Sequence, residues 1–294
     1  MTSKISSKKN IHNRKILILG AGYIANHLNV RLLSDGHLVK MLNSKTTNYH
    51  DDKIFWRELN FDFDPDIVIN CSGFTGRPNI DEAESKKSEC WRLNVTSPLR
   101  CAELTTRQGK KYIHIGSGCI YTGYDKEYTE EDEPNFGLFD NERSFYSKSK
   151  HAFELLSQNL PITIIRIRMP ISGMHDERSY LSKIAKYDDL IDYKNSKTYI
   201  PDLCSFVSIL ASDKNNFEYK YQIYNVVNPN PLSTSEVVEL MRKYGKHNPN
   251  WKFVDIDSIP IIAGRSNCIL DDSKVKNIMK MRNERDILEE VLRD

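Results

Sequence analysis

The sequence has no long hydrophobic run. None of its 294 residues lies in a stretch approaching the roughly 20 apolar residues that a membrane span requires, so no membrane partner is expected. Residues 1–14 are rich in Ser, Lys and Asn and lack the apolar segment of a secretory signal. We therefore expect a disordered tail over 1–14 and a cytoplasmic protein.

An excess of charge of either sign is also missing. The chain carries 42 Lys and Arg against 40 Asp and Glu, a formal net charge of +2. Nucleic acids and anionic membranes attract proteins through a strong overall positive field, which this chain does not have. We expect no nucleic-acid partner, and any anionic ligand has to be held by local groups.

The cysteines show neither a C-x-x-C pair nor a metal-binding spacing with histidine. No metal site is predicted, and most of the thiols lie inside apolar stretches. This usage is typical of reduced packing residues, and one cysteine is a candidate for chemistry because of its neighbours. The six are Cys71, Cys90, Cys101, Cys119, Cys204 and Cys268.

Over the first 170 residues, short apolar runs alternate with stretches of helical periodicity. Alternation of this kind predicts βαβ units, and hence an α/β fold with a Rossmann-type, doubly wound parallel sheet. The predicted strands are 15–19, 37–42, 66–70, 112–115 and 162–168, and the predicted helices are 23–33, 85–108 and 144–156.

Beyond Pro170 the pattern loosens and predicts a smaller C-terminal substrate-binding lobe. We assign 15–170 to a first domain that contains this sheet and 171–294 mostly to the lobe, with sheet and helix elements from about 190–228 returning to the first domain. An acidic loop is expected over 123–143. In the lobe we predict helices 179–186, 203–212, 233–244 and 284–292, and short strands near 191 and over 224–227.

A glycine-rich loop follows the first predicted strand. Residues 20–25 read G-x-G-x-x-A, where Gly20 permits a tight turn and Gly22 allows the backbone to approach a pyrophosphate. The helix that begins at Tyr23 and Ile24 would direct its N-terminus at the phosphates. The pattern predicts a dinucleotide site, although a plain tight turn has the same sequence.

The segment after the second strand indicates which dinucleotide binds. An acid there favours NAD, but this chain has Asn43 and Lys45 instead, which suit a ribose 2′-phosphate. We predict NADP(H), with NAD(H) as the alternative if Lys45 is simply solvated. Further cofactor contacts are expected from the ends of two other strands, at Cys71, Ser72, Gly73 and Met169.

A catalytic pattern begins at Tyr146, with Lys150 one helical turn later. The two side chains share one face of a helix, and the ammonium lowers the pKa of the phenol so that it can exchange a proton. An amphipathic helix often has this spacing by chance. The order of glycine loop, then Ser117 after a strand, then Tyr146 and Lys150 resembles the extended short-chain dehydrogenases/reductases.

Cys119 follows Ser117 by two residues, at the carboxyl end of a strand. If the chain stays extended there, both side chains point to the same side of the sheet. We therefore predict that Cys119 projects into the cleft with Ser117, rather than packing in the core as an isolated cysteine usually does.

Several strings resemble a narrower family, the plant nucleotide-rhamnose synthase/epimerase-reductases. Members are bifunctional UDP-4-keto-6-deoxy-glucose 3,5-epimerases/4-reductases. The last of these strings is also similar to a signature of bacterial dTDP-4-dehydrorhamnose reductases. The matching strings are 75–79, 116–120, 144–148, 166–171 and 265–271.

The resemblance implies a role for each matching residue. Ser117, Tyr146 and Lys150 correspond to the reductase triad, which also contacts the cofactor. Cys119 and Lys183 correspond to the acid/base pair of epimerisation; without the resemblance, Lys183 would be read as a solvated helix lysine. The substrate-binding positions that it implies are Thr75, Arg77, Asn79, Arg265 and Asn267.

The chain departs from the family in two respects. Its glycine loop is one residue shorter than the family's G-x-x-G-x-x-G and has Ala25 in the third place. Plant rhamnose synthases also carry a 4,6-dehydratase in the same chain, so here a separate dehydratase is expected to supply UDP-4-keto-6-deoxy-glucose. A homodimer is a family-level expectation. The alternatives are a reductase-only dTDP-4-dehydrorhamnose reductase and a non-catalytic dinucleotide-binding regulatory subunit.

Overall fold

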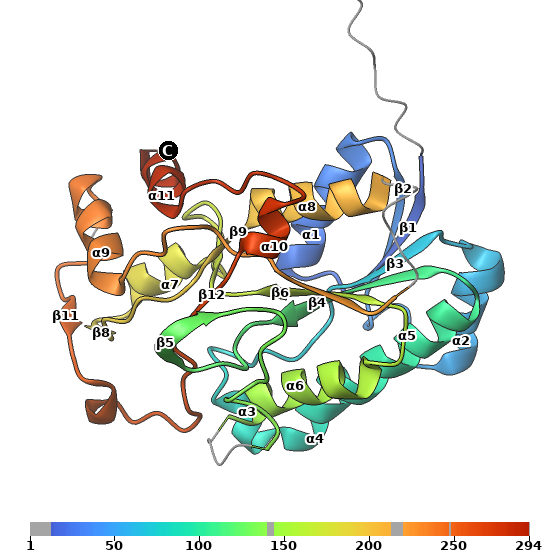
Figure 1. The fold of residues 1–294 in the computed structure, drawn as a ribbon, viewed down its shortest axis with the longest axis horizontal. Coiled ribbons are helices and arrows are strands. Elements are labelled where there is room, and N and C mark those ends of the chain that lie inside the picture. The colour runs from blue at the N-terminus through green and yellow to red at the C-terminus, as the bar shows by residue number, and fades with distance from the viewer. Residues whose placement is uncertain (1–12, 140–143, 213–219, 247, 294) are drawn as a thin grey trace, which may run out of the picture.

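Six parallel strands form the centre of the molecule, in the order β10-β6-β4-β3-β1-β2 (Figure 1). The computed structural model describes residues 13–139, 144–212, 220–246 and 248–293. The predicted tail lies outside the described residues except for its last two positions. The strands are β1 (Lys15–Leu19), β2 (Leu38–Leu42), β3 (Ile67–Asn70), β4 (Lys111–Ser117), β6 (Thr163–Ile167) and β10 (Gln222–Asn225).

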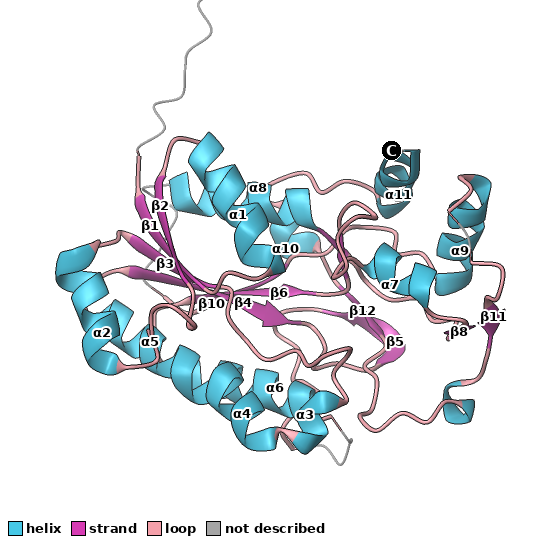
Figure 2. Ribbon diagram, turned by 180° about the vertical axis from the view of Figure 1, so that it is seen from behind, coloured by secondary structure: helices cyan, strands magenta, loops and turns pink. Residues whose placement is uncertain are grey.

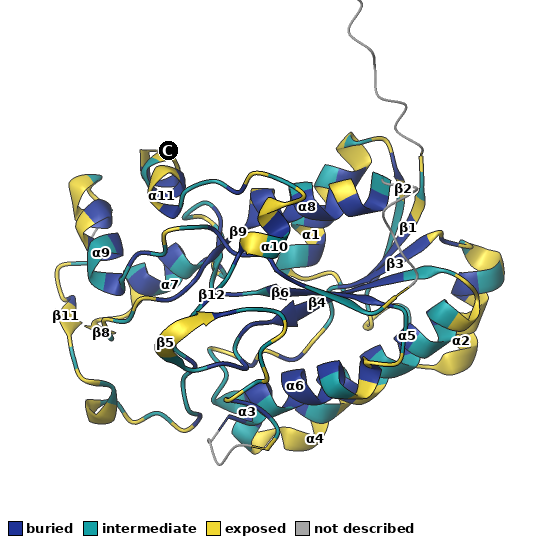
Figure 3. Cartoon of the chain, viewed as in Figure 1, coloured by how far each residue is buried: buried dark blue, intermediate teal, exposed yellow. Residues whose placement is uncertain are grey.

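The apolar runs that predicted these strands are the buried centre of the sheet. β1 and β3 pair in parallel with Ile16 opposite Ile67, and the side chains of both residues are almost inaccessible to solvent. A parallel sheet is covered on both faces, which is why its strands are continuously apolar instead of alternating. Figure 3 shows the same burial along the central strands. The predicted doubly wound sheet is confirmed.

Helices cover both faces of the sheet (Figures 1 and 2). On one face α1 and α8 pack together, and the Arg31 guanidinium donates to the Ser205 hydroxyl at 2.7 Å between them. This layer contains α1 (Tyr23–Ser34), α8 (Ile200–Ser212) and α10 (Ser273–Lys276). The opposite layer contains α2 (Asp52–Arg57), η1 (Glu58–Asp62), α3 (Glu82–Ser85), α4 (Lys87–Trp91), α5 (Ser97–Arg107) and α6 (Phe145–Ser157).

The long helix predicted over 85–108 is present but contains a π-helical turn, η2 (Arg92–Thr96), between α4 and α5. Asn94 lies in this turn and is fully buried. Its side chain accepts from the Phe74 backbone N–H at 2.7 Å and donates to the Phe74 carbonyl at 3.0 Å. Such π turns often occur at functional sites. Here the turn anchors the chain just after β3.

The smaller lobe lies at the carboxyl-end side of the sheet and has its own apolar core, which includes Leu181, Val237 and Leu288 (Figure 1). Its helix α9 begins with a capping box, in which Ser233 and Glu236 bond reciprocally. The elements of the lobe are β7 (Pro170–Ile171), α7 (Tyr180–Lys186), β8 (Asp189–Leu190), β9 (Thr198–Tyr199), α9 (Thr234–Lys243), β11 (Lys252–Phe253), η3 (Ile256–Ser258) and α11 (Glu284–Arg293).

One prediction about the segment between β4 and α6 was wrong. The segment 123–143 was expected to be a loop, but it begins with the strand β5 (Gly123–Tyr128), which pairs in parallel with β12 (Cys268–Leu270). Most of β5 is exposed, as Figure 3 shows, so it carries no apolar pattern that could predict a strand. Its partner lies far along the sequence. Residues 140–143 lie outside the described residues.

All six cysteines are free thiols, as expected. Four are buried, whereas Cys71 and Cys119 are partly exposed. In the part of the chain that the structure describes, no helix is long and apolar enough to cross a membrane.

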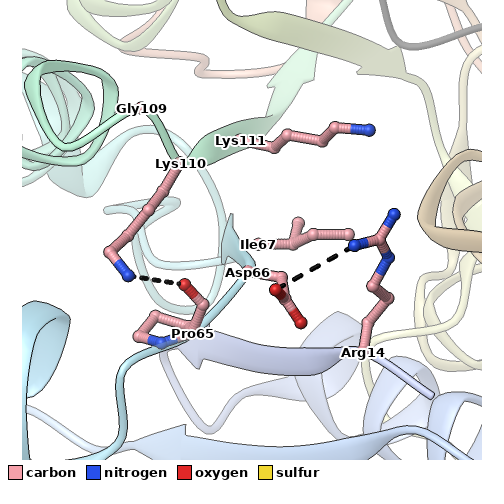
Figure 4. Close-up of a pocket in the computed structure, with 7 residues that line it drawn as sticks. All are labelled: Arg14, Pro65, Asp66, Ile67, Gly109, Lys110 and Lys111. Atoms are coloured by element: carbon pink, nitrogen blue, oxygen red, sulfur yellow. Dashed lines mark hydrogen bonds and ion pairs between the residues drawn. The ribbon is translucent and has the colours of Figure 1, made fainter. Parts of the chain in front are cut away.

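A hollow of about 220 Å³ lies at the amino ends of β1, β3 and β4 (Figure 4). Its polar rim is internally paired: Arg14 faces Asp66, and the Lys110 ammonium donates to the Pro65 carbonyl at 3.0 Å. Ligands of open α/β sheets bind at the opposite edge, outside the carboxyl ends of the strands. The hollow therefore lies at the edge of the sheet opposite to the one where ligands of such folds bind.

Candidate active site

The sheet reverses its order of connection between β1 and β3. From β1 the chain passes through α1 to β2 at the edge of the sheet, whereas β3 lies on the other side of β1. The loops after these strands are in close contact: a Cβ on Gly20 would lie 3.1 Å from the Ser72 nitrogen. Gly20 also has a φ of +102°. Only glycine fits this crowded, left-handed position, and a crevice of this type is where doubly wound folds hold dinucleotides.

The N-terminus of α1 faces this crevice. Gly22 is its N-cap, no side chain caps the helix, and its first turn contains no acid. No atom lies within 4 Å of a Cβ built on Gly22. Open backbone N–H groups at the positive end of a helix dipole suit a phosphate.

The next two predicted cofactor residues have side chains with other roles. The Tyr23 hydroxyl donates to the Ser172 hydroxyl at 2.6 Å, and Ile24 packs against the core. Burial raises the pKa of Tyr23. These two residues therefore offer the crevice their backbone groups, not their side chains.

The turn after β2 holds the two residues expected to read the ribose. The Asn43 side-chain oxygen accepts from the Lys45 backbone N–H at 3.0 Å, so Asn43 shapes the turn. The Lys45 side chain is exposed. An exposed ammonium beside the crevice is compatible with a 2′-phosphate.

The loop after β3 is held by a buried polar pair. The Asn70 oxygen accepts from both the backbone N–H and the hydroxyl of Ser72, at 3.0 and 2.5 Å, and the Asn70 amide contacts the His114 ring at 3.0 Å. His114 is buried, and its Nε2 has no hydrogen-bond partner among the described residues. Burial raises the pKa of the neighbouring Cys71 thiol.

Three residues predicted to be catalytic come together at the carboxyl end of β4. Ser117 is the last residue of β4, and its hydroxyl lies near enough to the Tyr146 phenol on α6 to lower the pKa of that phenol. The Lys150 ammonium lies 5.9 Å from the centre of the Tyr146 ring. Ser144 fixes the start of α6 by accepting from the Ser147 N–H at 3.3 Å. The juxtaposition that the sequence order implied is therefore present.

Burial dominates the electrostatics of this group. It raises the pKa of Tyr146, as does Cys119, whereas the contact with Ser117 and the charge of Arg168 lower it. Burial also lowers the pKa of Lys150 to about 8. A cation that titrates near neutrality beside a buried phenol is typical of sites that transfer protons.

Gly73 lies close to the Lys150 side chain. A Cβ on Gly73 would lie 3.4 Å from the Lys150 ammonium and 3.0 Å from the Asn94 oxygen. The crevice loop and α6 are thus in contact. Because Asn94 also bonds to the Ser149 hydroxyl at 2.9 Å, the π turn helps to hold α6 in place. Sequence reasoning missed Asn94, since only the tertiary contacts distinguish it from a surface amide.

The predicted path of the chain at Cys119 was wrong. β4 ends at Ser117 and the chain turns at Gly118, so the two side chains are not on one face of an extended strand. Instead, the Cys119 backbone N–H donates to the Ser117 hydroxyl at 3.2 Å, and its side chain packs near Tyr146 and Phe145. The turn brings the thiol to the catalytic group by a different route.

Lys183 approaches the same group from the smaller lobe. It lies on α7, partly buried, and is near enough to Cys119 for their charges to interact. Burial lowers the pKa of Lys183, and the positive charge of Arg178 lowers it further. Lys183 is therefore not a fully solvated helix lysine.

Arg178 links the lobe to the loop after β3, and sequence reasoning missed it. Its guanidinium donates to the Thr75 hydroxyl at 3.3 Å. Arg77 is exposed, and its backbone N–H donates to Glu82 at 2.7 Å. The Asn79 side chain accepts from the Asp81 N–H at 2.8 Å, which shapes the loop. Of the three predicted substrate residues here, Thr75 is thus the one bound to the lobe.

Arg265 already has a partner. Its guanidinium binds the Asp81 carboxylate through two nitrogens, at 2.8 and 2.9 Å, and this pair lowers the pKa of Asp81. The Asn267 oxygen accepts from the Asn195 amide at 2.9 Å. The resemblance implies substrate contacts at both positions, and in this structure Arg265 also joins the lobe to the first domain.

Met169 follows β6 and has a φ of +34°, which is unusual for a residue with a side chain. It lies at the carboxyl edge with the other predicted cofactor residues. Among the described residues, no group of three or more His, Cys, Asp and Glu side chains is arranged to hold a metal ion.

The chain belongs to the RmlD substrate binding domain family, whose model matches residues 14–294. It is 36% identical over 224 residues to a bifunctional dTDP-4-dehydrorhamnose 3,5-epimerase/dTDP-4-dehydrorhamnose reductase of Arabidopsis thaliana, a match that covers 72% of this chain and 71% of that protein. A trifunctional UDP-glucose 4,6-dehydratase/UDP-4-keto-6-deoxy-D-glucose 3,5-epimerase/UDP-4-keto-L-rhamnose-reductase of the same plant is 35% identical, and the match covers 72% of this chain but 32% of that protein.

Solved structures share the fold. The UDP-rhamnose synthase of Acanthamoeba polyphaga mimivirus superposes with a TM-score of 0.83 at 26% identity, covering 96% of this chain and 99% of that one. The dTDP-4-dehydrorhamnose reductase of Bacillus anthracis, solved in complex with NADP, gives a TM-score of 0.78 at 19% identity and covers 95% and 97%. The chain is thus a Rossmann-like α/β protein of the RmlD type.

Proposed function

We propose that this protein reduces the 4-keto group of a nucleotide-linked 6-deoxyhexose with NADPH, after epimerising the sugar at C-3 and C-5. The substrate is UDP-4-keto-6-deoxy-D-glucose and the product UDP-L-rhamnose, and a separate 4,6-dehydratase supplies the substrate. The observation that carries the proposal is the buried Ser117–Tyr146–Lys150 group, with Cys119 and Lys183 beside it.

The crevice fits a nicotinamide dinucleotide. A Cβ on Gly22 would have no described neighbour within 4 Å, so the backbone there has room for a pyrophosphate. The close approach of Gly20 to Ser72 forms the wall of the crevice. Lys45 is the nearby cation for a 2′-phosphate, which favours NADPH over NADH. When bound, this cofactor supplies the hydride for the 4-keto carbon.

A single pair of donors can serve both reactions. Loss of a proton from C-3 or C-5 places negative charge on the C-4 oxygen, and so does reduction at C-4. Ser117 and Tyr146, whose hydroxyls lie near each other, would stabilise that oxygen in both cases. Tyr146 would then donate its proton to the oxygen, and the charge of Lys150 would favour the resulting phenolate.

Epimerisation requires an acid and a base on opposite faces of the sugar ring. Cys119 comes from the loop after β4 and Lys183 from α7, so they reach the site from different elements. The pKa of Lys183, lowered by burial and by Arg178, brings its ammonium closer to exchanging protons at neutral pH. This pair supports epimerisation, because reduction alone needs neither group.

The deciding experiment is incubation with UDP-4-keto-6-deoxy-glucose and NADPH in deuterated water. The proposal predicts NADPH oxidation, a UDP-rhamnose product, and deuterium at C-3 and C-5, detected by NMR and mass spectrometry. Reduction without deuterium would leave a reductase that needs an already epimerised substrate. Binding of NADPH with neither turnover nor exchange would indicate a regulatory subunit. A parallel reaction with the dTDP-linked sugar measures the nucleotide preference.

A substitution at Gly20 tests the cofactor crevice. Gly20→Ala is expected to weaken NADPH binding by about tenfold or more, because the new Cβ strains a left-handed residue and meets the backbone of Ser72. Gly245→Ala is the matched control, since Gly245 also has a positive φ, +69°, but no atom within 4 Å. The two affinities are compared by fluorescence titration. Equal weakening in both variants would argue against this crevice.

The pH dependence of reduction tests Lys150. Because its pKa is lowered to about 8, the ammonium loses its proton as the pH rises through that value, and kcat for 4-keto reduction is expected to fall. Lys150→Arg, which stays charged, should be slower overall but should lose this alkaline decline. The profile is measured from about pH 6 to about pH 10. Persistence of the same decline in Lys150→Arg would assign it to another group.

A further inference from the structure

Arg168 is one of the largest fully buried side chains, with an exposed fraction of 1%. It follows β6 directly and lies beneath the turn that carries Cys119. One terminal nitrogen donates to the Gly118 carbonyl at 3.0 Å and to the Ser266 hydroxyl at 2.7 Å. The other donates to the Asn195 oxygen at 2.6 Å and to the Ser266 carbonyl at 3.1 Å.

These partners are all neutral oxygens. Within the described residues, no recorded ion pair joins Arg168 to a carboxylate, and its Nε has no hydrogen-bond partner. Arg166, two residues earlier and also buried, is different, because it binds the Glu154 carboxylate at 2.7 Å. A buried charge without a counter-charge is costly, since desolvation is not repaid by attraction. Arg168 therefore leaves an uncompensated positive charge in the protein interior.

The stem of the Arg168 side chain packs against the turn that carries Cys119. A Cβ on Gly118 would lie 3.0 Å from the Arg168 side chain, so the guanidinium stem supports the turn between Ser117 and Cys119. The titratable groups whose charges interact with Arg168 are Cys119, Tyr124, Tyr146, Lys197 and Cys268. Those that interact with Cys119 in turn include Tyr146, Lys150 and Lys183.

We propose that Arg168 is a positioning residue that holds the 117–119 turn and supplies the uncompensated positive charge favouring negative charge on Cys119 and Tyr146. Within the described residues no carboxylate forms an ion pair with Arg168, so its charge is available when a thiolate or phenolate forms. Its effect extends to both proposed reactions, because both pass through these two groups. The inference rests on the proposed function for its catalytic consequence, but the effect on Cys119 is measurable without any substrate.

Two variants abolish the uncompensated charge in different ways, one by deletion and one by neutralisation. Arg168→Gln deletes the guanidinium, whereas Asn195→Asp keeps it and places an isosteric carboxylate beside it, where the Asn195 oxygen now lies at 2.6 Å. Ser266→Ala is the control, because it removes a hydrogen bond of Arg168 without changing the charge. Asn195→Asp also covers the case in which Arg168→Gln does not fold.

The measurement is the rate of iodoacetamide alkylation at Cys119, followed by mass spectrometry as a function of pH. Loss of a nearby positive charge disfavours the thiolate, so both variants are expected to move the half-maximal rate upward by about one pH unit, or about tenfold in rate at neutral pH. Ser266→Ala should follow the wild-type profile. Unshifted profiles in Asn195→Asp and in folded Arg168→Gln would overturn the proposal.

The same variants are then assayed for deuterium exchange in the keto-sugar. The wild type is expected to exchange deuterium. Slower exchange in Asn195→Asp, together with an upward displacement of the rising limb of its pH profile, supports the catalytic consequence. A lower amplitude without displacement would indicate a structural role only and would contradict it. If the wild type shows no exchange, the proposed epimerisation fails, while the alkylation profiles still decide the role of Arg168.

Discussion

Tyr146→Phe is expected to lower the rate of 4-keto reduction by about 10²–10⁴-fold, because it removes the proton donor. The site is buried, so water cannot readily take the place of this donor. NADPH oxidation in the presence of the keto-sugar, followed by absorbance, measures the loss. Deuterium exchange at C-3 and C-5 is expected to decrease less, since Ser117 still donates to the C-4 oxygen and the Cys119–Lys183 pair is retained.

Tyr112→Phe is the matched control for this substitution. Its phenol is also buried, but it donates to the Pro98 carbonyl at 3.1 Å, on the face covered by α5. This variant is expected to lose some stability and to keep its activity. If Tyr146→Phe reduced the keto-sugar at the wild-type rate, Tyr146 would not be the proton donor.

Cys119→Ala is expected to slow deuterium incorporation at C-3 and C-5 by about 10²–10⁴-fold, because it removes one of the two groups that exchange protons with the ring. Reduction of a sugar that is already epimerised, UDP-4-keto-rhamnose, should continue, since Ser117, Tyr146 and Lys150 remain. Exchange is followed by mass spectrometry and reduction by NADPH oxidation, so the two activities are separated in one variant.

Cys101→Ala controls for the loss of a thiol as such. Cys101 is buried in the core between the sheet and the helices of the second layer, away from Cys119. It is expected to exchange deuterium at the wild-type rate. Equal loss of exchange and reduction in Cys119→Ala would contradict the division of roles and would point to disruption of the 117–119 turn.

Much of the first domain was predictable because its signals are local. A strand buried on both faces is a continuous apolar run, as in β1 and β3, and a helix start is marked by a cap such as Ser144. The crevice glycines follow from the same logic, since only glycine adopts the φ of Gly20 beside another backbone.

The part that failed depended on partners far apart in the sequence. β5 is exposed and polar, and it is a strand only because β12 pairs with it. The ion pair of Arg265 with Asp81 likewise joins segments that are far apart in the sequence. No local pattern encodes either pairing.

The sequence by itself determined the α/β class, the dinucleotide loop and the order of Ser117, Tyr146 and Lys150, because these depend on spacing within one element or on the rule that parallel strands end at one edge. Tertiary structure alone decided that a turn, not an extended strand, brings Cys119 to Tyr146. It also decided that Arg168 is buried among neutral oxygens. Burial and the absence of a counter-charge are properties of the packed interior, and a one-dimensional pattern does not record them.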